Sequence, residues 1–246
     1  MPADHCQLNN KIMKSLVNYQ INDSVATITM NDGKVNAMSP DMQAELSAAL
    51  DQAVKDKAVV VLTGREGIFS GGFDLPTLKA GGETALQMLI GGFELSERIL
   101  KFPTPVIIAN PGHCIAMGVF IMLSADYRIG IDGPFKMGAN EVAIGLVVPE
   151  SAIEICRNQL TSACFNRSML TSEFFQPKDA LQAGFLDKLV AQEELLAVAQ
   201  SLASEYVKLD NRAYQATKAK VRGDLYKRVR AGIENDEIFL RKFFNI

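Results

Sequence analysis

The sequence is poor in the side chains from which most metal centres and nucleophilic triads are built. Its 246 residues include two histidines, His5 and His113, and four cysteines, none of which forms a C-x-x-C pair. No zinc site with ordinary ligand spacing can be assembled from this supply, so we expect no metal centre. A Ser-His-Asp triad would depend on one of only two imidazoles, and we do not expect one.

The sequence also has no excess of positive charge and no long hydrophobic run. It holds 25 lysines and arginines against 28 aspartates and glutamates, which gives a net charge of −3. A nucleic-acid partner would need a basic face, and a membrane span would need about 20 consecutive apolar residues, so we expect neither nucleic acid nor membrane as a partner. Scattered cysteines without an N-terminal signal sequence favour a reducing, cytoplasmic location.

What is present is an ordinary globular composition, 48% hydrophobic and 22% charged, long enough for one large domain. Two short runs rich in β-branched residues, Leu16–Ile21 and Val25–Met30, predict a β-hairpin. Ser39 followed by Pro40 is a typical helix start, and apolar spacing after it predicts an amphipathic helix. The continuous apolar run Ala58–Thr63 predicts a buried strand, parallel to its neighbour within a βαβ unit.

Glycine pairs follow that strand in the segment Gly64–Leu75. They indicate unusual backbone angles or the close approach of another group. The segment matches neither a phosphate-binding loop, which needs Lys before Ser or Thr, nor a dinucleotide-binding fingerprint. The next segment, Pro76–Glu94, holds two more glycine pairs around a short apolar stretch. Its pattern leaves open a mobile flap over a pocket and a poorly patterned pair of helices.

The stretch Asn110–Asp126 changes polarity and direction within a few residues. It follows the apolar run Pro105–Ala109, which predicts a buried strand, and it opens with a sharp Asn-Pro-Gly turn. From about Ala116 it predicts a helix that is apolar on every face and must therefore be buried. The first N–H groups of a helix have no intrahelical partner, so this helix start can bind negative charge. Taken alone, the stretch favours a core helix behind a core strand.

Glu141 is the only acidic residue between Asp132 and Glu150, and small and apolar residues surround it. A carboxylate in apolar surroundings has a raised pKa, which suits a general acid or base. A glutamate at a surface turn or a helix cap is the alternative, and the local sequence alone favours that alternative.

The chain from Ser151 to its end is mostly helical in pattern. Helices are predicted at Ser151–Leu160, Cys164–Leu170, Pro177–Ala183, Gln192–Lys208 and Arg212–Phe244. Basic residues concentrate in Lys218–Arg230, which favours a solvated face and leaves open a site that grips an anionic ligand. At the other end, Met1–Ser15 shows no clear pattern and predicts a loose arm.

Four segments in a fixed order carry a resemblance to a known family: Gly67–Leu75, Pro105–Asp126, Gly138–Gly145 and Ala180–Leu189. Together they resemble the crotonase family, the enoyl-CoA hydratases and isomerases, from about Leu16 to the C-terminus. The resemblance implies an α/β fold in which ββα units form a spiral core, residues 1–190, followed by a C-terminal helical region, residues 191–246. It also implies a homotrimer or a dimer of trimers.

The resemblance further implies an acyl-CoA thioester as substrate, so that coenzyme A is part of the substrate and no separate cofactor is expected. Two backbone N–H groups would hold the thioester oxygen as it becomes an enolate oxyanion, those of Phe73 and Met117. Removing one preorganised donor of this kind typically costs roughly 3 kcal/mol of barrier. The glycine-pair loop would also lie along the coenzyme A, through Gly71, Gly72, Phe73, Asp74 and Leu75.

The acid–base residues of the family separate its activities. Hydratases use two glutamates, of which the second matches Glu141 and the first falls at Phe120, a side chain that cannot transfer a proton. The mitochondrial type of Δ3,Δ2-enoyl-CoA isomerase keeps only the second and has an apolar residue at the first position. The resemblance therefore implies an isomerase in which Glu141 takes a proton from C2 of the acyl chain and returns it at C4.

Other interpretations stay open within the same resemblance. A hydratase or another acyl-CoA lyase would use Glu141 with Glu150 or a bound water. A dienoyl-CoA isomerase would want an aspartate where this sequence has Pro149, and the lack of tryptophan counts against the aroyl-CoA dehalogenases. A non-catalytic acyl-CoA-binding member would hold Glu141 in a salt bridge away from the pocket.

Overall fold

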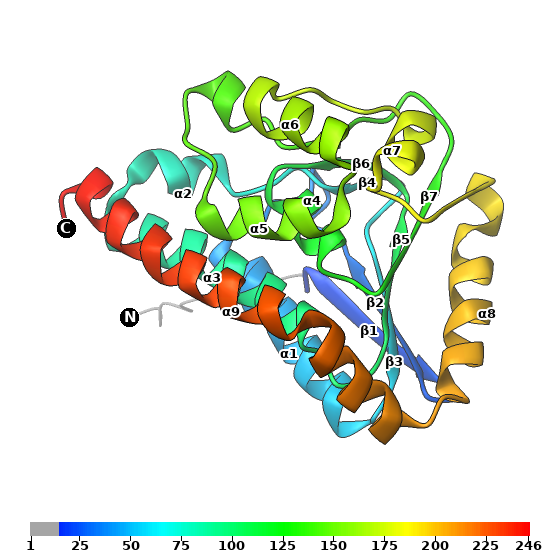
Figure 1. Ribbon diagram of the computed structural model, residues 1–246. Helices are drawn as coiled ribbons and strands as arrows, with labels where there is room; N and C mark the ends of the chain where they lie inside the picture. Colours follow the sequence, from blue (N-terminus) through cyan, green and yellow to red (C-terminus); the bar gives the residue numbers. More distant parts are fainter. Residues whose placement is uncertain (1–14) are drawn as a thin grey trace, which may run out of the picture.

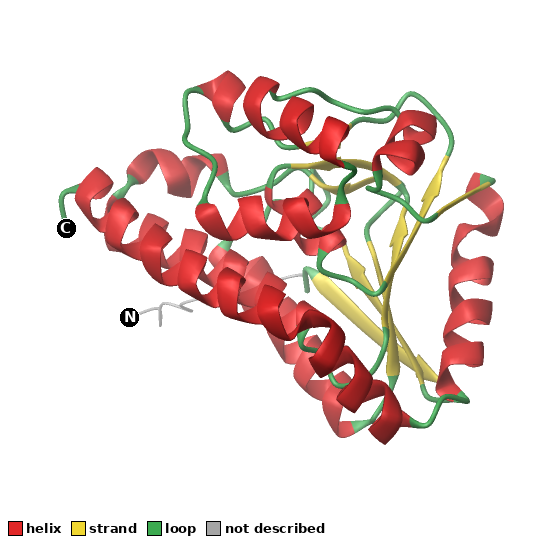
Figure 2. Cartoon of the chain, in the orientation of Figure 1, coloured by secondary structure: helices red, strands yellow, loops and turns green. Residues whose placement is uncertain are grey.

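The computed structural model describes residues 15–246, so the predicted arm Met1–Ser15 lies outside the described residues except for Ser15. Two β-sheets form the framework (Figures 1 and 2). In this part of the chain a larger sheet has the strand order β1-β2-β3-β5-β7-β9, and a smaller sheet has the order β4-β6-β8. The strands are β1 Val17–Asn22, β2 Val25–Met30, β3 Val59–Thr63, β4 Gly67–Ser70, β5 Val106–Asn110, β6 Gly112–Ile115, β7 Tyr127–Ile131, β8 Met137–Gly138 and β9 Lys188–Val190.

Helices cover both sheets. They are α1 Pro40–Lys55, α2 Leu75–Ala80, α3 Gly82–Leu100, α4 Met117–Leu123, α5 Glu150–Gln159, α6 Ser162–Thr171, α7 Pro177–Ala183, α8 Leu195–Val207 and α9 Asn211–Phe244, with 3-10 turns η1 Val142–Ile144 and η2 Gln192–Glu194. None of those within residues 15–246 is both long and apolar enough to cross a bilayer. The division of the chain at residue 190 stays a prediction.

One plan repeats along the spiral. β3, β5 and β7 lie in the larger sheet, and each is followed directly by a strand of the smaller sheet, β4, β6 or β8. The hairpin β1–β2 is antiparallel, and the other strand pairs of the two sheets are parallel. The α/β class, the spiral of ββα units and the parallel pairing of the Ala58–Thr63 strand with the hairpin are thus confirmed.

The larger sheet is buried on both faces. Val59 and Val61 of β3 belong to the apolar layer under α8, whereas Val60 and Leu62 belong to the core shared with α1, α3 and α4. Figure 1 shows α8 alone on one side of the sheet, with α1, α3 and α9 on the other. A strand that is covered on both faces has no polar face, which explains why β3 reads as a continuous apolar run.

The structure resolves one open prediction and adds elements that the sequence did not indicate. Pro76–Glu94 belongs to a pair of helices and not to a flap, because α3 runs unbroken through Gly91 and Gly92 to Leu100. The strands β4, β6 and β8 have two to four residues and contain glycine. Such short strands show too little alternation to be recognised in a sequence.

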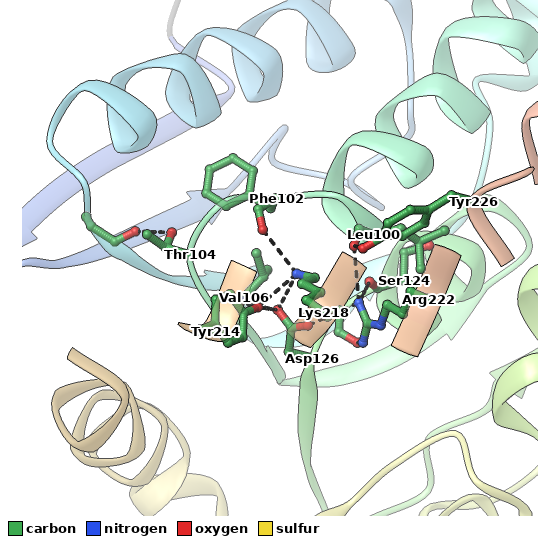
Figure 3. Close-up of polar contacts among 12 residues, drawn as sticks. Leu100, Phe102, Thr104, Val106, Ser124, Asp126, Tyr214, Lys218, Arg222 and Tyr226 are labelled. Carbon is green, nitrogen blue, oxygen red and sulfur yellow. Dashed lines mark hydrogen bonds and ion pairs between the residues drawn. The ribbon is translucent and has the colours of Figure 1, made fainter. Parts of the chain in front are cut away.

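The basic run Lys218–Arg230 is neither a solvated face nor a site for an anionic ligand at two of its positions, Lys218 and Arg222. Lys218 and Arg222 are buried against Asp126 (Figure 3). Further along α9, ion pairs reach α5 and α3 as Arg228–Glu154 and Arg230–Glu97. Both interpretations are wrong for Lys218 and Arg222, whereas Arg228 and Arg230 keep much of their exposure, as on a solvated face. α9 lies across α3 and α5 (Figure 1).

Asp236, near the end of α9, holds the start of α5. Its carboxylate accepts hydrogen bonds from the backbone N–H of Glu150 at 2.7 Å and of Ser151 at 3.0 Å. The Ser151 hydroxyl also donates to it, at 2.6 Å. N–H groups in the first turn of a helix have no intrahelical acceptor, and a negative charge is favourable there. Asp236 therefore couples the C-terminal helix to the helix that follows Glu141.

We expect Asp236→Ala to lower the free energy of unfolding by about 2 kcal/mol, because it removes a helix cap and leaves buried N–H groups unpaired. Asp236→Asn keeps one acceptor oxygen and should lose less. Urea unfolding of the two variants measures the difference, with Asp224→Ala, at an exposed position of the same helix, as the control. Equal losses in the Ala and Asn variants would contradict this assignment.

Candidate active site

The loop that follows β4 is held in place at both of its ends. Backbone hydrogen bonds of 2.8 Å join Gly71 and Gly72 to the segment 35–38. At the other end, the Asp74 carboxylate accepts an N–H of the first turn of α2 at 3.0 Å and caps that helix. Phe73 lies between these two anchors, so its backbone has little freedom.

The start of α4 lies directly against this loop. Gly72 has φ +97°, and a Cβ at Gly72 would lie 2.8 Å from Ala116 Cβ and 3.6 Å from Met117 N. Ala116 has φ +50°, an angle that residues other than glycine rarely adopt. Neither the Phe73 N–H nor the Met117 N–H donates to an acceptor within residues 15–246. Two adjoining segments thus each offer an unused backbone donor.

Gly92 of α3 gives the Phe73 and Met117 side chains the room to meet. A Cβ at Gly92 would come within 2.6 Å of the Phe73 ring and 3.1 Å of Met117 Sδ, closer than packed atoms approach one another. A glycine inside a helix costs about 1 kcal/mol relative to alanine. Its position in the middle of α3 follows from this close packing, which brings together the two residues predicted to hold the oxyanion.

Aromatic rings continue from Phe73 into the core. The Phe73 and Phe93 ring centroids lie 6.2 Å apart, edge to face, and those of Phe93 and Phe120 lie 5.7 Å apart. Phe120, on α4, is only 1% exposed. The position where the resemblance puts the first hydratase glutamate is therefore occupied by a ring in a dry, apolar environment, in which an unpaired charge would be costly.

Glu141 lies between β8 and the turn η1. Its backbone oxygen accepts hydrogen bonds from Ile144 N at 3.1 Å and Leu146 N at 2.9 Å, which fix the residue in position. The residue is 9% exposed, and its Oε2 has no hydrogen-bond partner in the described part of the chain. The local sequence favoured a glutamate at a surface turn or a cap. The turn is present, but the side chain is buried.

Burial sets the protonation behaviour of Glu141. Loss of hydration raises the pKa of its carboxyl group to about 7, although the backbone N–H groups of Glu141 and Asn140 act in the opposite direction. Burial, and then the nearby Glu141 carboxylate, raise the pKa of the Cys156 thiol on α5. A carboxyl group whose pKa is near 7 can both take and release a proton at neutral pH. α5, which carries Cys156, packs against α4.

The remaining predicted residues have other contacts. Asp74 uses its carboxylate to cap α2, and Leu75, at the first position of that helix, is exposed. Glu150, the candidate second acid, is exposed as well, and its Oε2 accepts a hydrogen bond from Asn235 Nδ2 at 2.8 Å. Glu150 is thus the first residue of α5, with its carboxylate on the surface and bound to α9.

Three residues of this region were not predicted from the sequence. Gly92 had a signal in the sequence, since a glycine pair inside a helical pattern needs a packing reason. Ala116 had none, because its positive φ is imposed by the turn from β6 into α4. Cys156 had none either, because only the packing of α5 brings it near Glu141.

A cavity of about 560 Å³ lies between α1 and α3, lined by residues that include Gln43, Met88 and Gly91. Its lining includes neither Phe73, Met117 nor Glu141. Within residues 15–246, no three histidine, cysteine, aspartate or glutamate side chains gather closely enough to hold a metal ion.

Comparison with known proteins finds similar chains that are described as enoyl-CoA hydratases or isomerases. A family model described as enoyl-CoA hydratase/isomerase matches residues 20–246. The human mitochondrial enoyl-CoA delta isomerase 1 is 30% identical over 209 residues, which are 80% of this chain and 67% of the human protein. A crystal structure of an enoyl-CoA hydratase/isomerase family protein from Pseudomonas syringae is 47% identical with a TM-score of 0.90, covering 92% of this chain and 98% of that one. An enoyl-CoA hydratase from Mycobacterium marinum is 40% identical with a TM-score of 0.87, covering 91% and 98%.

The raised pKa of Glu141 should make stability depend on pH. Its folded-state pKa of about 7 lies above its ordinary 4.5, so the protonated form stabilises the fold fully below pH 4.5 and that contribution is lost as pH rises through 7. We expect the stability of the wild type, relative to Glu141→Gln, to fall by about 2 kcal/mol between pH 5 and pH 8. Urea unfolding at both pH values measures this difference. Glu193→Gln, at an exposed glutamate, is the control, and parallel profiles of wild type and Glu141→Gln would refute the expectation.

Proposed function

The chain belongs to the enoyl-CoA hydratase/isomerase family, and we propose that within this family it is an isomerase that shifts the double bond of a 3-enoyl-CoA to the 2-position. Glu141 acts as the acid and base, and the N–H groups of Phe73 and Met117 bind the thioester oxygen. The observation that carries the proposal is the Glu141 carboxyl group, which is buried, without a partner for Oε2 among the described residues, and has a pKa near neutral.

The reaction needs one proton-transfer group. The Glu141 carboxylate takes a proton from C2, and the electrons of that C–H bond move into a dienolate whose negative charge reaches the thioester oxygen. The two N–H groups stabilise this oxyanion, the largest single contribution that such sites usually make. Glu141 then returns the proton to C4, and the double bond lies between C2 and C3. No water is consumed and no second carboxyl group is required.

The apolar surroundings of Phe120 support isomerisation over hydration. Adding water asks for a group that activates the water as well as a proton donor, and the family's hydratases use two glutamates. In this chain Phe120 occupies the position of the first glutamate, and its ring packs in series with those of Phe93 and Phe73. Similar proteins carry both names, an isomerase in human and a hydratase in Mycobacterium marinum, so hydration is the second candidate function.

A non-catalytic acyl-CoA-binding role is supported less well. That hypothesis expects Glu141 to be held in a salt bridge, away from the pocket. Glu141 forms no ion pair with residues 15–246, and its pKa is raised by burial with no cation nearby to lower it. A carboxyl group kept buried and unpaired costs stability, and such costs are typical of functional sites.

Assembly as a homotrimer or a dimer of trimers is part of the same proposal. Apolar side chains near Glu141 are exposed in the single chain, namely Val142, Ile144, Val147 and Leu170. A contact between copies over η1 and α6 would cover them and would hold the Glu141 segment more firmly.

We expect Glu141→Gln to lower kcat for isomerisation of a 3-enoyl-CoA on the order of 10³-fold, because the amide cannot carry the proton. Binding of the CoA thioester should change little, since shape and polarity are preserved. Steady-state assays over a panel of 3-enoyl thioesters of different lengths, with calorimetric measurement of Kd, separate the two effects. Glu150→Gln is the matched control and should keep full activity. Undiminished turnover of Glu141→Gln would contradict the proposed mechanism.

We expect Phe120→Glu to gain hydration of a 2-enoyl-CoA, on the order of 10-fold over the wild type, because it supplies the carboxyl group that hydratases use at this position. Isomerisation should fall, since a charge enters the apolar ring series. Formation of 3-hydroxyacyl-CoA is the measurement, with circular dichroism to check folding. Phe120→Gln is the control, because glutamine has the size of glutamate but no ionisable group. Identical hydration rates in the Glu and Gln variants would contradict the role of this position.

A further inference from the structure

We propose that Arg222 and Lys218 of α9 are positioning residues for the oxyanion site: they fix the C-terminal ends of α3 and α4 and thereby set where the Met117 N–H lies. The proposal rests on the function proposed above. Arg222 and Lys218 act through α3, which contacts Phe73 and Met117 at Gly92, and through α4, which begins at Met117.

The two cations share one carboxylate inside the protein (Figure 3). Lys218 Nζ lies 2.9 Å from Asp126 Oδ2, and Arg222 Nη1 lies 3.0 Å from Asp126 Oδ1. Asp126 also accepts hydrogen bonds from Tyr214 OH at 2.9 Å and from Val106 N at 2.8 Å, at the start of β5. The side chains of Lys218 and Arg222 are only 6% and 13% exposed. Two segments far from each other in the sequence, the start of β5 and the first turns of α9, therefore meet at one carboxylate.

Two positive charges face one negative charge, and the carbonyl groups at the C-terminal ends of two helices offset the excess positive charge. Arg222 donates to the backbone oxygen of Leu100, the last residue of α3, at 3.4 Å, and Lys218 Nζ donates to Phe102 O at 3.2 Å. Arg222 also donates to Ser124 O at 3.4 Å and Ala125 O at 3.2 Å, just after α4. The C-terminus of a helix carries partial negative charge and unpaired carbonyl groups, so a cation is favourable there.

α4 is short enough to transmit this placement to its other end. It has seven residues, which span about 10 Å, and every one of them is buried. Its N-terminus has no side-chain cap. The Met117 N–H is at that end, so the fixed C-terminal end determines how far along its axis the helix lies. A donor misplaced by about 1 Å can cost on the order of 10²-fold in rate.

α3 is held by the same cluster and meets the same site. Its Gly92 is the surface against which the Phe73 ring and Met117 Sδ pack, and its last carbonyl group is bound by both Arg222 and Tyr226 OH, the latter at 2.9 Å. Arg222 thus ties together the ends of the two helices that enclose the donors. A lysine could hold one of these oxygens, but it could not bridge Asp126, Leu100 and Ala125 at once, because it lacks the planar fork of donors.

The test compares Arg222→Met and Arg222→Lys with Lys220→Met, a neutralised lysine at an exposed position of the same helix. We expect Arg222→Met to lower kcat for the 3-enoyl-CoA roughly 10- to 100-fold with KM changed less than about 3-fold. Arg222→Lys should lose less, and Lys220→Met should match the wild type. Thermal unfolding confirms that each variant is folded at the assay temperature. A kcat within about 2-fold of the wild type in folded Arg222→Met would overturn the proposal.

A second readout does not depend on turnover. A 3-oxoacyl-CoA binds an oxyanion site in part as its enolate, whose near-ultraviolet absorbance reports how well the two donors hold the charge. We expect the bound enolate fraction to fall in Arg222→Met and, less so, in Arg222→Lys, with Kd nearly unchanged. If Arg222→Met does not fold, the Arg222→Lys measurement decides, and an unchanged enolate fraction there overturns the proposal. If the wild type forms the enolate but does not isomerise any enoyl-CoA, the proposed reaction is refuted. The enolate absorbance of the variants then decides on the positioning role alone.

Discussion

The close packing of neighbouring segments at three glycines is the constraint on which the rest of the structure depends. The loop at Gly72 lies against the turn at Ala116, α3 meets Phe73 and Met117 at Gly92, and α4 contacts β4 at Gly118. A Cβ on any of these glycines would come within 2.9 Å of an atom already there. Because glycine has no side chain at these contacts, the segments of Phe73 and Met117, more than 40 residues apart in the sequence, lie against each other. The two sheets serve to stack the turns of the spiral so that these approaches occur.

Glu141 and Phe120 show how burial affects two different side chains of the site. Both side chains are almost without exposure, but the first is ionisable and the second belongs to a series of rings. Loss of hydration makes the carboxyl group a weaker acid, so it can exchange a proton at neutral pH. The same loss of hydration makes a second charge nearby expensive. A dry site therefore suits a reaction that moves one proton along a substrate better than one that must also admit and activate water.

The sequence predicted the elements that have a strong period and missed those whose form depends on neighbours. The helix that begins at Pro40 and the helices after Ser151 were predicted to within a few residues, because amphipathic spacing and caps are local signals. The smaller sheet was missed because its strands are short and rich in glycine. For Glu141 the apolar neighbours left an acid–base role open, but the local sequence favoured a surface turn or a cap, because segments from far along the chain produce its burial. Lys218 and Arg222 in the basic run of α9 were misjudged for the same reason: their partner Asp126 lies about 90 residues earlier.

The Asp126 cluster also has a consequence for the order in which the protein is completed. Synthesis proceeds from the N-terminus, and Asp126 is made well before the two cations that neutralise it. Until Lys218 and Arg222 emerge, the Asp126 carboxylate has the Val106 N–H but neither cation, and the carbonyl groups at the ends of α3 and α4 lack these two donors, which disfavours their final packing. The region around Phe73 and Met117 lacks this support until the last helix docks. The fold thus links the maturation of its central site to the arrival of the C-terminus, and a chain shortened within α9 loses more than the residues removed.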